Sequence, residues 1–174
     1  QELQNGFAGT GIKLVSPAVS DNGTGQSWLS SFMSQASSQG LRVDAVAFHW
    51  YGISDPHDPI GAANSFMSRV DSYHNSYGKP VWITEFAIHD WGGNYSDEEM
   101  RAANAIFLGN IIPRLESRSY VIGYAWYHWF NDAKLVEGSP LLPTNVGLEY
   151  VGVIRNGEVY DFAGQNLGEH VAYL

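Results

Sequence analysis

The chain has 174 residues, a formal net charge of −9 and no cysteine. An acidic surface repels nucleic acids, anionic membranes and polyanionic substrates, but it permits a neutral ligand. Without cysteine the chain has no disulfide, thiolate metal ligand or cysteine nucleophile, and no apolar run of about 18 residues is present to span a membrane. A chain of this length buries one sizeable core, so we predict that residues 1–174 form a single domain.

The first half of the chain alternates between predicted strands and predicted helices. Apolar, β-branched stretches predict strands at 12–19, 43–50 and 81–86. Between them, apolar residues at helical spacing predict helices at 27–38 and 62–76, with Gly40 and Gly78 as stop signals.

The second half continues this alternation and then departs from it. Ser96 and Glu99 have the spacing of a capping box, which predicts a helix from Ser96 towards Arg118 that Pro113 should kink or shorten. A continuous apolar stretch predicts a fourth strand at 120–130. The Asn156-Gly157 turn signal predicts a hairpin at 150–162, and a short final helix is expected at about 167–173.

This order of elements predicts an α/β fold built from βα units around a parallel sheet. Four units are too few to close an eight-stranded barrel, which takes about 250 residues. An open four-stranded sheet is one interpretation, and half of a (β/α)8 TIM barrel is the more specific one.

Polar and aromatic side chains are found where the predicted strands end. Alternation along the strands places residues 81, 83 and 85 on one face, with 82, 84 and 86 on the other. The same rule places His49 with Tyr51, and Trp126 with His128. An apolar strand has no structural reason to end on Glu85, because burying an unpaired carboxylate is costly. The carboxyl ends of parallel strands are where α/β proteins carry out their chemistry.

A carboxylate beside flat aromatic rings and neutral hydrogen-bond donors suits the cleavage of glycosidic bonds. The carboxylate attacks or stabilises an oxocarbenium-like centre, while tyrosine and histidine hold it in place. An indole packs against the apolar face of a pyranose ring. Trp91, in the predicted loop after Glu85, is a further candidate for stacking on sugars.

Four segments of the chain resemble glycoside hydrolase family 128, a family of endo-β-1,3-glucanases in the clan of retaining (β/α)8 hydrolases. They are LVSPAV at 14–19, HWYG at 49–52, KPVWITEFA at 79–87 and YAW at 124–126. The resemblance extends from Gly11 to about Phe130. It implies that the four predicted strands are strands five to eight of the barrel, and that the chain is the C-terminal portion of a glycosidase barrel with a β-hairpin before its last helix.

The resemblance also implies roles for particular residues. Glu85 corresponds to the nucleophile of strand seven, with Tyr51 or His49 as its orienting partner. Trp126 corresponds to the platform beneath the sugar at the cleavage point. The expected activity is retaining hydrolysis of a neutral β-linked polysaccharide, with β-1,3-glucan as the first expectation, and such a protein is expected to be secreted.

The second carboxylate of a retaining hydrolase is the point at which this chain departs from the clan. There the acid/base is a glutamate that follows asparagine at the end of strand four, and the chain contains no Asn-Glu pair. We therefore expect the acid/base to lie outside this chain. The alternative is a non-catalytic half-barrel that binds polysaccharide, or an inactive fragment. A half-barrel is further expected to pair with its missing half or to form a homodimer, because its outer strands have free edges.

Other chemistries have less support in the sequence. His49, His128 and Glu85 are of a type that ligates metals, but their aromatic surroundings suit sugars better, so no metal or cofactor is expected. His57, His74 and His89 are expected at the surface. Trp50, Trp82 and Trp129 fall on the helix-facing side of the strands, where plain packing is expected, although Trp50 and Trp129 lie near strand ends where a cleft is the alternative.

Overall fold

The computed structural model describes residues 2–52, 55–151, 154–155, 158–160 and 166–169. These residues fall into two compact units. Unit 1 comprises Gln1–Tyr51, Phe66–Phe86 and Arg118–Trp126, and unit 2 comprises Gly52–Ser65, Ala87–Ser117 and Tyr127–Leu174.

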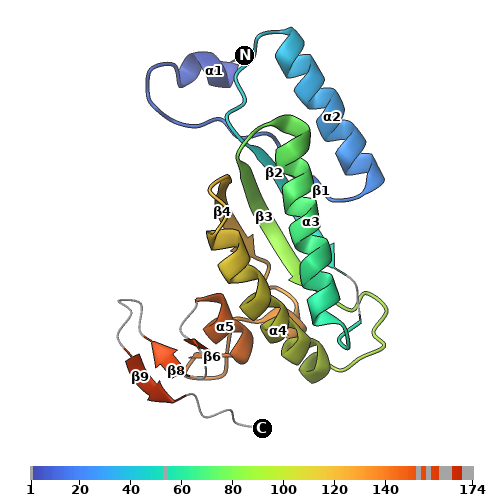
Figure 1. The fold of residues 1–174 in the computed structure, drawn as a ribbon, viewed down its shortest axis with the longest axis vertical. Helices are drawn as coiled ribbons and strands as arrows, with labels where there is room; N and C mark the ends of the chain where they lie inside the picture. The colour runs from blue at the N-terminus through green and yellow to red at the C-terminus, as the bar shows by residue number, and fades with distance from the viewer. Residues whose placement is uncertain (1, 53–54, 152–153, 156–157, 161–165, 170–174) are drawn as a thin grey trace. The chain divides into compact units, whose positions relative to one another are not determined.

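A four-stranded parallel sheet organises unit 1. Its strands are β1 (Val19–Ser20), β2 (Val46–Gly52), β3 (Val81–Ile88) and β4 (Val121–Trp126), and they lie in the order β1-β2-β3-β4 (Figure 1). Sequential order and parallel direction are what βα units produce. Each crossover helix returns the chain to the end of the sheet where the previous strand began, so the next strand lies beside it and runs parallel to it. The predicted α/β class with a parallel sheet is confirmed.

The helices fall close to where the sequence predicts them. They are α1 (Glu2–Gly6), α2 (Gly23–Ser38), α3 (Pro59–Tyr77), α4 (Asp97–Glu116) and α5 (Asn145–Tyr150). At the start of α2 the side chain of Asn22 accepts a hydrogen bond from the Gly25 backbone N–H, which satisfies one of the free donors of the first turn. None of the helices within the described residues is long and apolar enough to cross a membrane.

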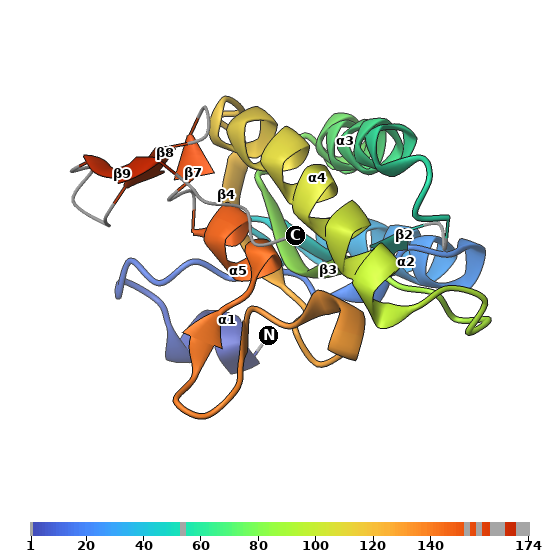
Figure 2. The same ribbon diagram turned by 90° about the horizontal axis from the view of Figure 1, so that it is seen from below.

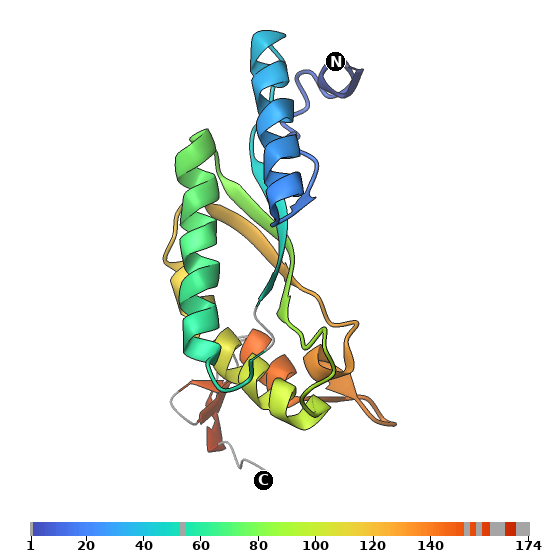
Figure 3. The same ribbon diagram turned by 90° about the vertical axis from the view of Figure 1, so that its right-hand side faces the viewer.

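Helix α3 lies against one face of the sheet (Figure 3), and aromatic side chains fix it there. Phe66 lies 5.0 Å from the ring of Trp50 on β2 and 5.1 Å from Phe86 on β3. About two helical turns further along, Tyr73 stacks on Phe48 at 4.1 Å. These helix-facing side chains are all buried. The expected packing role of Trp50 is therefore confirmed, and the opposite face of β2 is left to carry His49 and Tyr51.

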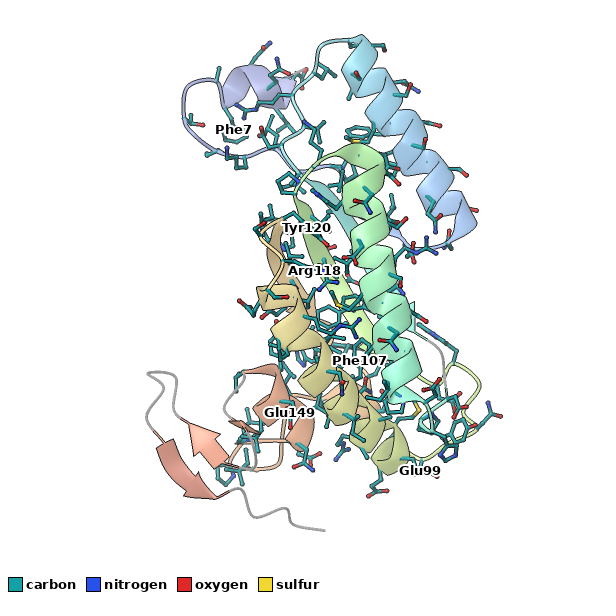
Figure 4. The ribbon with its side chains drawn as sticks, in the orientation of Figure 1. Phe7, Glu99, Phe107, Arg118, Tyr120 and Glu149 are labelled. Atoms are coloured by element: carbon teal, nitrogen blue, oxygen red, sulfur yellow. The ribbon has the colours of Figure 1, made fainter. Side chains whose placement is uncertain are left out.

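An ion pair ties α3 to the start of β4 at the other end of the sheet. Arg118 makes two bonds to the Asp71 carboxylate, Nε to Oδ1 at 2.7 Å and Nη2 to Oδ2 at 3.1 Å. The hydroxyl of Tyr120 bonds the same carboxylate, and Figure 4 shows Arg118 and Tyr120 close together. Burial, and then the bond to Asp71, raises the pKa of Tyr120 above its ordinary value. His74 stacks on Tyr120 at 3.9 Å and is therefore not the surface residue that the sequence predicts.

In unit 2, α4 packs against α5 and against the short 3-10 helix η1 (Asn131–Ala133) (Figure 2). The capping box is confirmed, since Ser96 N–H donates to Glu99 Oε2 and Glu99 N–H donates to Ser96 Oγ. Figure 4 labels Glu99 at the start of α4. Phe107, Leu108 and Ile111 are fully buried on the inner face of α4. Pro113 lies in the last turn, three residues before the helix ends.

Both outer strands of the sheet are shorter than predicted. The stretch 12–19 yields only β1 and an isolated bridge between Val15 and Ala45, because Pro17 has no N–H to give to a ladder. The strand predicted to reach residue 130 ends at Trp126.

The C-terminal region is partly as predicted. Strands β7 (Ile154–Arg155) and β8 (Glu158–Tyr160) pair antiparallel with Arg155 opposite Glu158, which confirms the hairpin, while its turn residues 156–157 lie outside the described residues. The predicted final helix is wrong over 167–169, since β9 (Asn166–Glu169) pairs with β8 instead. Asn166 and Gly168 favour helix poorly, and the free edge of β8 offers this segment a ladder. Residues 170–173 lie outside the described residues. The short pair β5 (Val136–Glu137) and β6 (Leu142–Pro143) was not predicted.

Candidate active site

Glu85 lies near the carboxyl end of β3, with two side chains of β2 beside it. The hydroxyl of Tyr51 donates a hydrogen bond to Oε2 of Glu85. The same oxygen lies 3.7 Å from Nδ1 of His49. The Glu85 side chain keeps 37% of its surface exposed, so the carboxylate is held by its neighbours and still accessible. The predicted companions, Tyr51 and His49, are both in place.

The backbone around Glu85 departs from simple strand alternation. The pairing of β3 with β4 is irregular between Ile83 and Phe86, which is the signature of a β-bulge. Phe86 faces α3 as predicted, but Thr84, predicted on that same side, contacts His49 together with Glu85. The predicted separation of residues 84 and 85 onto opposite faces is therefore wrong, because the bulge turns both side chains towards β2.

Thr84 determines which nitrogen of His49 carries the proton. The Thr84 hydroxyl lies 3.1 Å from the Phe48 carbonyl oxygen and 3.0 Å from His49 Nδ1. A carbonyl can only accept, so the single hydroxyl proton goes to Phe48 and the Thr84 oxygen accepts from His49. His49 is thus protonated at Nδ1, an arrangement that the nearby Glu85 carboxylate also favours. In the neutral ring, Nε2 is left as a hydrogen-bond acceptor.

We call Tyr51, His49, Thr84 and Glu85 the Glu85 cluster. Both contacts to Glu85 fall on Oε2, and within the described residues no hydrogen bond falls on Oε1. The cluster therefore holds one carboxylate oxygen and leaves the other for an electrophile. Sequence reasoning identified three of these residues but missed Thr84, whose role depends on the bulge.

Trp126 lies on β4, directly opposite Phe86 in the register of the two strands. Its ring meets Phe86 edge to face at 5.2 Å, and only 6% of the residue is exposed. Trp126 is thus a packed neighbour of the residue that follows Glu85. Trp82, expected to pack beneath a helix, is instead 42% exposed, and its indole lies where a Cβ on Gly123 would come within 3.1 Å.

The two other predicted site residues, Trp91 and His128, belong to unit 2. His128 follows the end of β4. Trp91 follows β3 and is 64% exposed. Its ring contacts His89 and Phe130, and His89 bonds Asp132 at 2.9 Å from Nδ1 to Oδ2. His89 is therefore not the surface histidine that the sequence predicts. We call His89, Trp91, Phe130 and Asp132 the Trp91 cluster.

The loop that carries Trp91 is fixed by the carboxylate of Asp90. Asp90 accepts hydrogen bonds from the backbone N–H groups of Gly92, Asn94 and Tyr95 and is 8% exposed. Burial by itself raises the pKa of Asp90, but the bonds from Tyr95, Gly92 and Asn94 outweigh it and lower the pKa below its ordinary value. Within the described part of the chain, no group of three or more histidine, aspartate or glutamate side chains is arranged to hold a metal ion.

Comparison with known proteins places the chain in a family. The family model described as "Glycosyl hydrolase catalytic core" matches residues 1–152. The alkali-sensitive linkage protein 1 of Schizosaccharomyces pombe is 32% identical over 148 residues, which are 81% of this chain and 24% of that protein.

Solved structures show the same similarity. A GH128 subgroup I endo-β-1,3-glucanase from Amycolatopsis mediterranei, in complex with laminaripentaose, superimposes with a TM-score of 0.69 at 31% identity, over 86% of this chain and 61% of that one. A GH128 subgroup III curdlan-specific exo-β-1,3-glucanase from Blastomyces gilchristii, in complex with glucose, gives 0.61 at 30% identity over 86% and 57%. The chain thus spans about a quarter of the curated relative and about three fifths of the solved ones. Because the family model covers most of its length, the chain belongs to the glycosyl hydrolase catalytic core family.

Proposed function

We propose that this chain is the nucleophile-bearing part of a retaining glycoside hydrolase of the GH128 type that acts on β-1,3-glucan, with Glu85 as the nucleophile. The observation that carries the proposal is the Glu85 cluster, in which Tyr51 binds one oxygen of a half-exposed carboxylate at a strand end. The four strands then correspond to strands five to eight of a (β/α)8 barrel.

The similar solved proteins support the substrate. The Amycolatopsis enzyme is a β-1,3-glucanase that was crystallised with laminari-oligosaccharides, and two of its variants each replace a different glutamate. The Blastomyces enzyme is curdlan-specific. The net charge of −9 agrees with an uncharged polysaccharide. Such a substrate is extracellular, and we propose that the parent protein is secreted.

In the first chemical step, Oε1 of Glu85 attacks the anomeric carbon and the bond from that carbon to the leaving oxygen breaks. The Tyr51 hydroxyl stays on Oε2 and keeps the carboxylate in position. His49, protonated at Nδ1, places a positive edge near the carboxylate and presents Nε2 to a sugar hydroxyl. His128 and Trp91 are the remaining substrate contacts in this proposal, whereas Trp126, 6% exposed, packs against Phe86.

Both steps on a glucan use a second carboxylate. A general acid must protonate the leaving oxygen, and as a base it must then activate the water that hydrolyses the glycosyl ester. In retaining enzymes the two carboxyl groups lie about 5–5.5 Å apart. We propose that the sequence preceding Gln1 in the parent protein supplies this residue. That segment, or a second copy of this chain, would also cover the exposed Trp82 and Ile122 of the sheet.

Three assays test the proposal. A 2,4-dinitrophenyl β-laminaribioside needs no acid, because dinitrophenolate leaves without a proton. This chain alone should therefore release about one equivalent of dinitrophenolate in a burst and form the glycosyl ester on Glu85. Extension of the chain with its preceding sequence should add activity on laminarin. In the Glu85→Ala variant, azide should restore cleavage and yield the α-glycosyl azide. A β-glycosyl azide would make Glu85 the acid/base instead.

The alternative is a non-catalytic chain that only binds polysaccharide. The exposed indole of Trp91, which belongs to the other unit, is the observation that favours it. An extended protein that binds laminarin and cleaves neither substrate would support this alternative. Light scattering on the 174-residue chain tests the pairing proposal, because a well-dispersed monomer would contradict a closed homodimer.

A further inference from the structure

Three rings in the Trp91 cluster adopt one defined arrangement. His89 and Phe130 are stacked, with centroids 3.7 Å apart and planes 7° from parallel. Trp91 is almost perpendicular to both, at 4.8 Å and 88° from His89 and at 5.4 Å and 83° from Phe130.

These distances place the indole beside the stacked pair. A ring that continued the stack would be near one of the two rings and far from the other, whereas Trp91 is nearly equidistant from both. Perpendicular rings about 5 Å apart make edge-to-face contacts, since an edge-to-edge contact needs a wider spacing. The edges of His89 and Phe130 therefore meet one face of the indole. The residue is 64% exposed, so a large part of the remaining indole surface is accessible to solvent.

Buried polar groups hold this arrangement from behind. Asp132, 3% exposed, binds Nδ1 of His89 and thereby fixes the orientation of the imidazole ring. Oδ1 of Asp132 is buried and has no hydrogen-bond partner among the described residues. The bond from His89 to Oδ2 is therefore the side-chain hydrogen bond of this carboxylate within the described part of the chain. The fully buried Asn104 donates to the Asp132 carbonyl at 3.0 Å and makes two bonds to Ile88.

The indole is therefore exposed on one side and immobilised on the other. Single exposed aromatic residues are common and need no explanation. Trp129 is such a residue, since it is 79% exposed and makes no ring contact within the described part of the chain. Trp91 differs because its backing rings, the Asp132 bond and the Asp90 loop all restrict it, which lowers the entropy that a ligand must remove.

We propose that the open face of Trp91 is a saccharide platform that stacks on the apolar face of a neutral pyranose, and that His89 and Asp132 are its positioning residues. The choice of β-glucan as ligand rests on the proposed function. The platform belongs to unit 2, whereas the Glu85 cluster belongs to unit 1, so the two are separable by experiment.

The test is an NMR titration of the 174-residue chain with laminarihexaose, cellohexaose and mannohexaose, observed at the tryptophan indole N–H resonances. We expect the Trp91 resonance to shift with laminarihexaose. Trp91→Ala should weaken binding by about tenfold, the scale of one aromatic stacking contact. Trp129→Ala, which removes an indole of similar exposure without backing, should leave the affinity unchanged.

The outcomes separate this inference from the proposed function. Shifts around Glu85 with none at Trp91, together with unchanged affinity in Trp91→Ala, overturn the platform and leave the glucanase proposal intact. A Trp91 response to cellohexaose or mannohexaose alone supports the platform and contradicts the β-1,3 substrate. No Trp91 response to any of the three sugars overturns the platform.

The positioning role has its own test. Asp132→Asn keeps an oxygen that accepts from His89, so we expect affinity within about twofold of the parent. Asp132→Leu removes the acceptor that orients the imidazole, so the affinity should fall about fivefold. Thermal unfolding of both variants defines a temperature at which both are folded. A folded Asp132→Leu chain that binds laminarihexaose as the parent does, or an Asp132→Asn chain that is equally impaired, overturns the positioning role.

Discussion

The Glu85 cluster and the Trp91 cluster each join a carboxylate, a histidine and aromatic rings, but they expose opposite members of the set. In the first, the carboxylate is 37% exposed and tyrosine and histidine hold it from the side. In the second, the Asp132 side chain is only 4% exposed and the aromatic ring faces solvent. The exposed carboxylate is able to react, whereas the buried one can only orient its neighbour. In our proposals, the same residue types thus serve chemistry in one unit and binding in the other.

The largest effect should come from removing the exposed carboxylate. Glu85→Gln keeps the shape of the side chain but abolishes the nucleophile, so cleavage of 2,4-dinitrophenyl β-laminaribioside should fall by at least about a thousandfold. Glu98→Gln, an exposed glutamate in the first turn of α4, is the matched control and should be unchanged. Equal activity in the two variants would remove Glu85 from the chemistry.

Breaking the support of the Trp91 cluster should instead reduce stability. Asn104→Leu leaves the N–H and carbonyl of Ile88 and the carbonyl of Asp132 without their partner, which should cost about 3 kcal/mol of unfolding free energy. Denaturant unfolding measures this change. Asn110→Leu removes an exposed asparagine of the same helix and should change the free energy by less than about 0.5 kcal/mol. An unchanged unfolding free energy in Asn104→Leu would mean that the hydrogen bonds of Asn104 do not support the cluster.

The hydroxyl of Tyr51 should matter to rate and little to folding. Tyr51→Phe removes one charge-assisted hydrogen bond to Glu85, and bonds of that kind contribute about 1.5–3 kcal/mol. The rate on the dinitrophenyl glycoside should fall by roughly 10- to 100-fold. Tyr77→Phe on α3 serves as the control. An unchanged rate in Tyr51→Phe would show that the carboxylate needs no such partner.

Thr84 distinguishes a positioning role from packing. Thr84→Val keeps the branched shape and loses the hydroxyl, so ¹⁵N NMR should show that the proton of neutral His49 no longer resides mainly on Nδ1. The accompanying loss of rate should be about three- to tenfold, the scale of one neutral hydrogen bond. Thr84→Ser should restore both properties. An Nδ1 proton that persists in Thr84→Val would contradict this assignment.

The smallest effect concerns pH and the loop that carries Trp91. Because the folded pKa of Asp90 lies below its ordinary value, about 3.9, its contribution to stability is complete above that pH and is lost as the pH falls through the folded value. The parent should therefore unfold at a higher temperature than Asp90→Asn near neutral pH, and the difference should shrink below about pH 4. A difference that grew on acidification would reverse the sign of this account.

The sequence predicts strand ends better than it predicts strand faces. Glu85, within the apolar stretch of β3, and the His49 to Tyr51 segment identify the cluster, because a costly polar group near a strand end needs a partner. Thr84 escaped prediction because a bulge breaks the two-residue period, and a bulge leaves no mark in side-chain pattern. The link between His89 and Asp132 joins residues 43 positions apart, so no local spacing reveals it.

The final segment failed for a related reason. Residues 167–169 lie in a strand because β8 offers them a partner, and that partner outweighs a weak helical pattern. Propensity decides least where a segment is short and a free edge is near.

The central claim is that Glu85 attacks the anomeric carbon, and covalent trapping tests it most directly. The 174-residue chain is incubated with 2,4-dinitrophenyl 2-deoxy-2-fluoro-β-laminaribioside, whose fluorine slows hydrolysis of the ester while dinitrophenolate leaves without a proton. Peptide mass spectrometry should find the added disaccharide on Glu85, and Glu85→Gln should remain unlabelled. A label on another carboxylate, or release of dinitrophenolate from Glu85→Gln at the parent rate, would contradict the account.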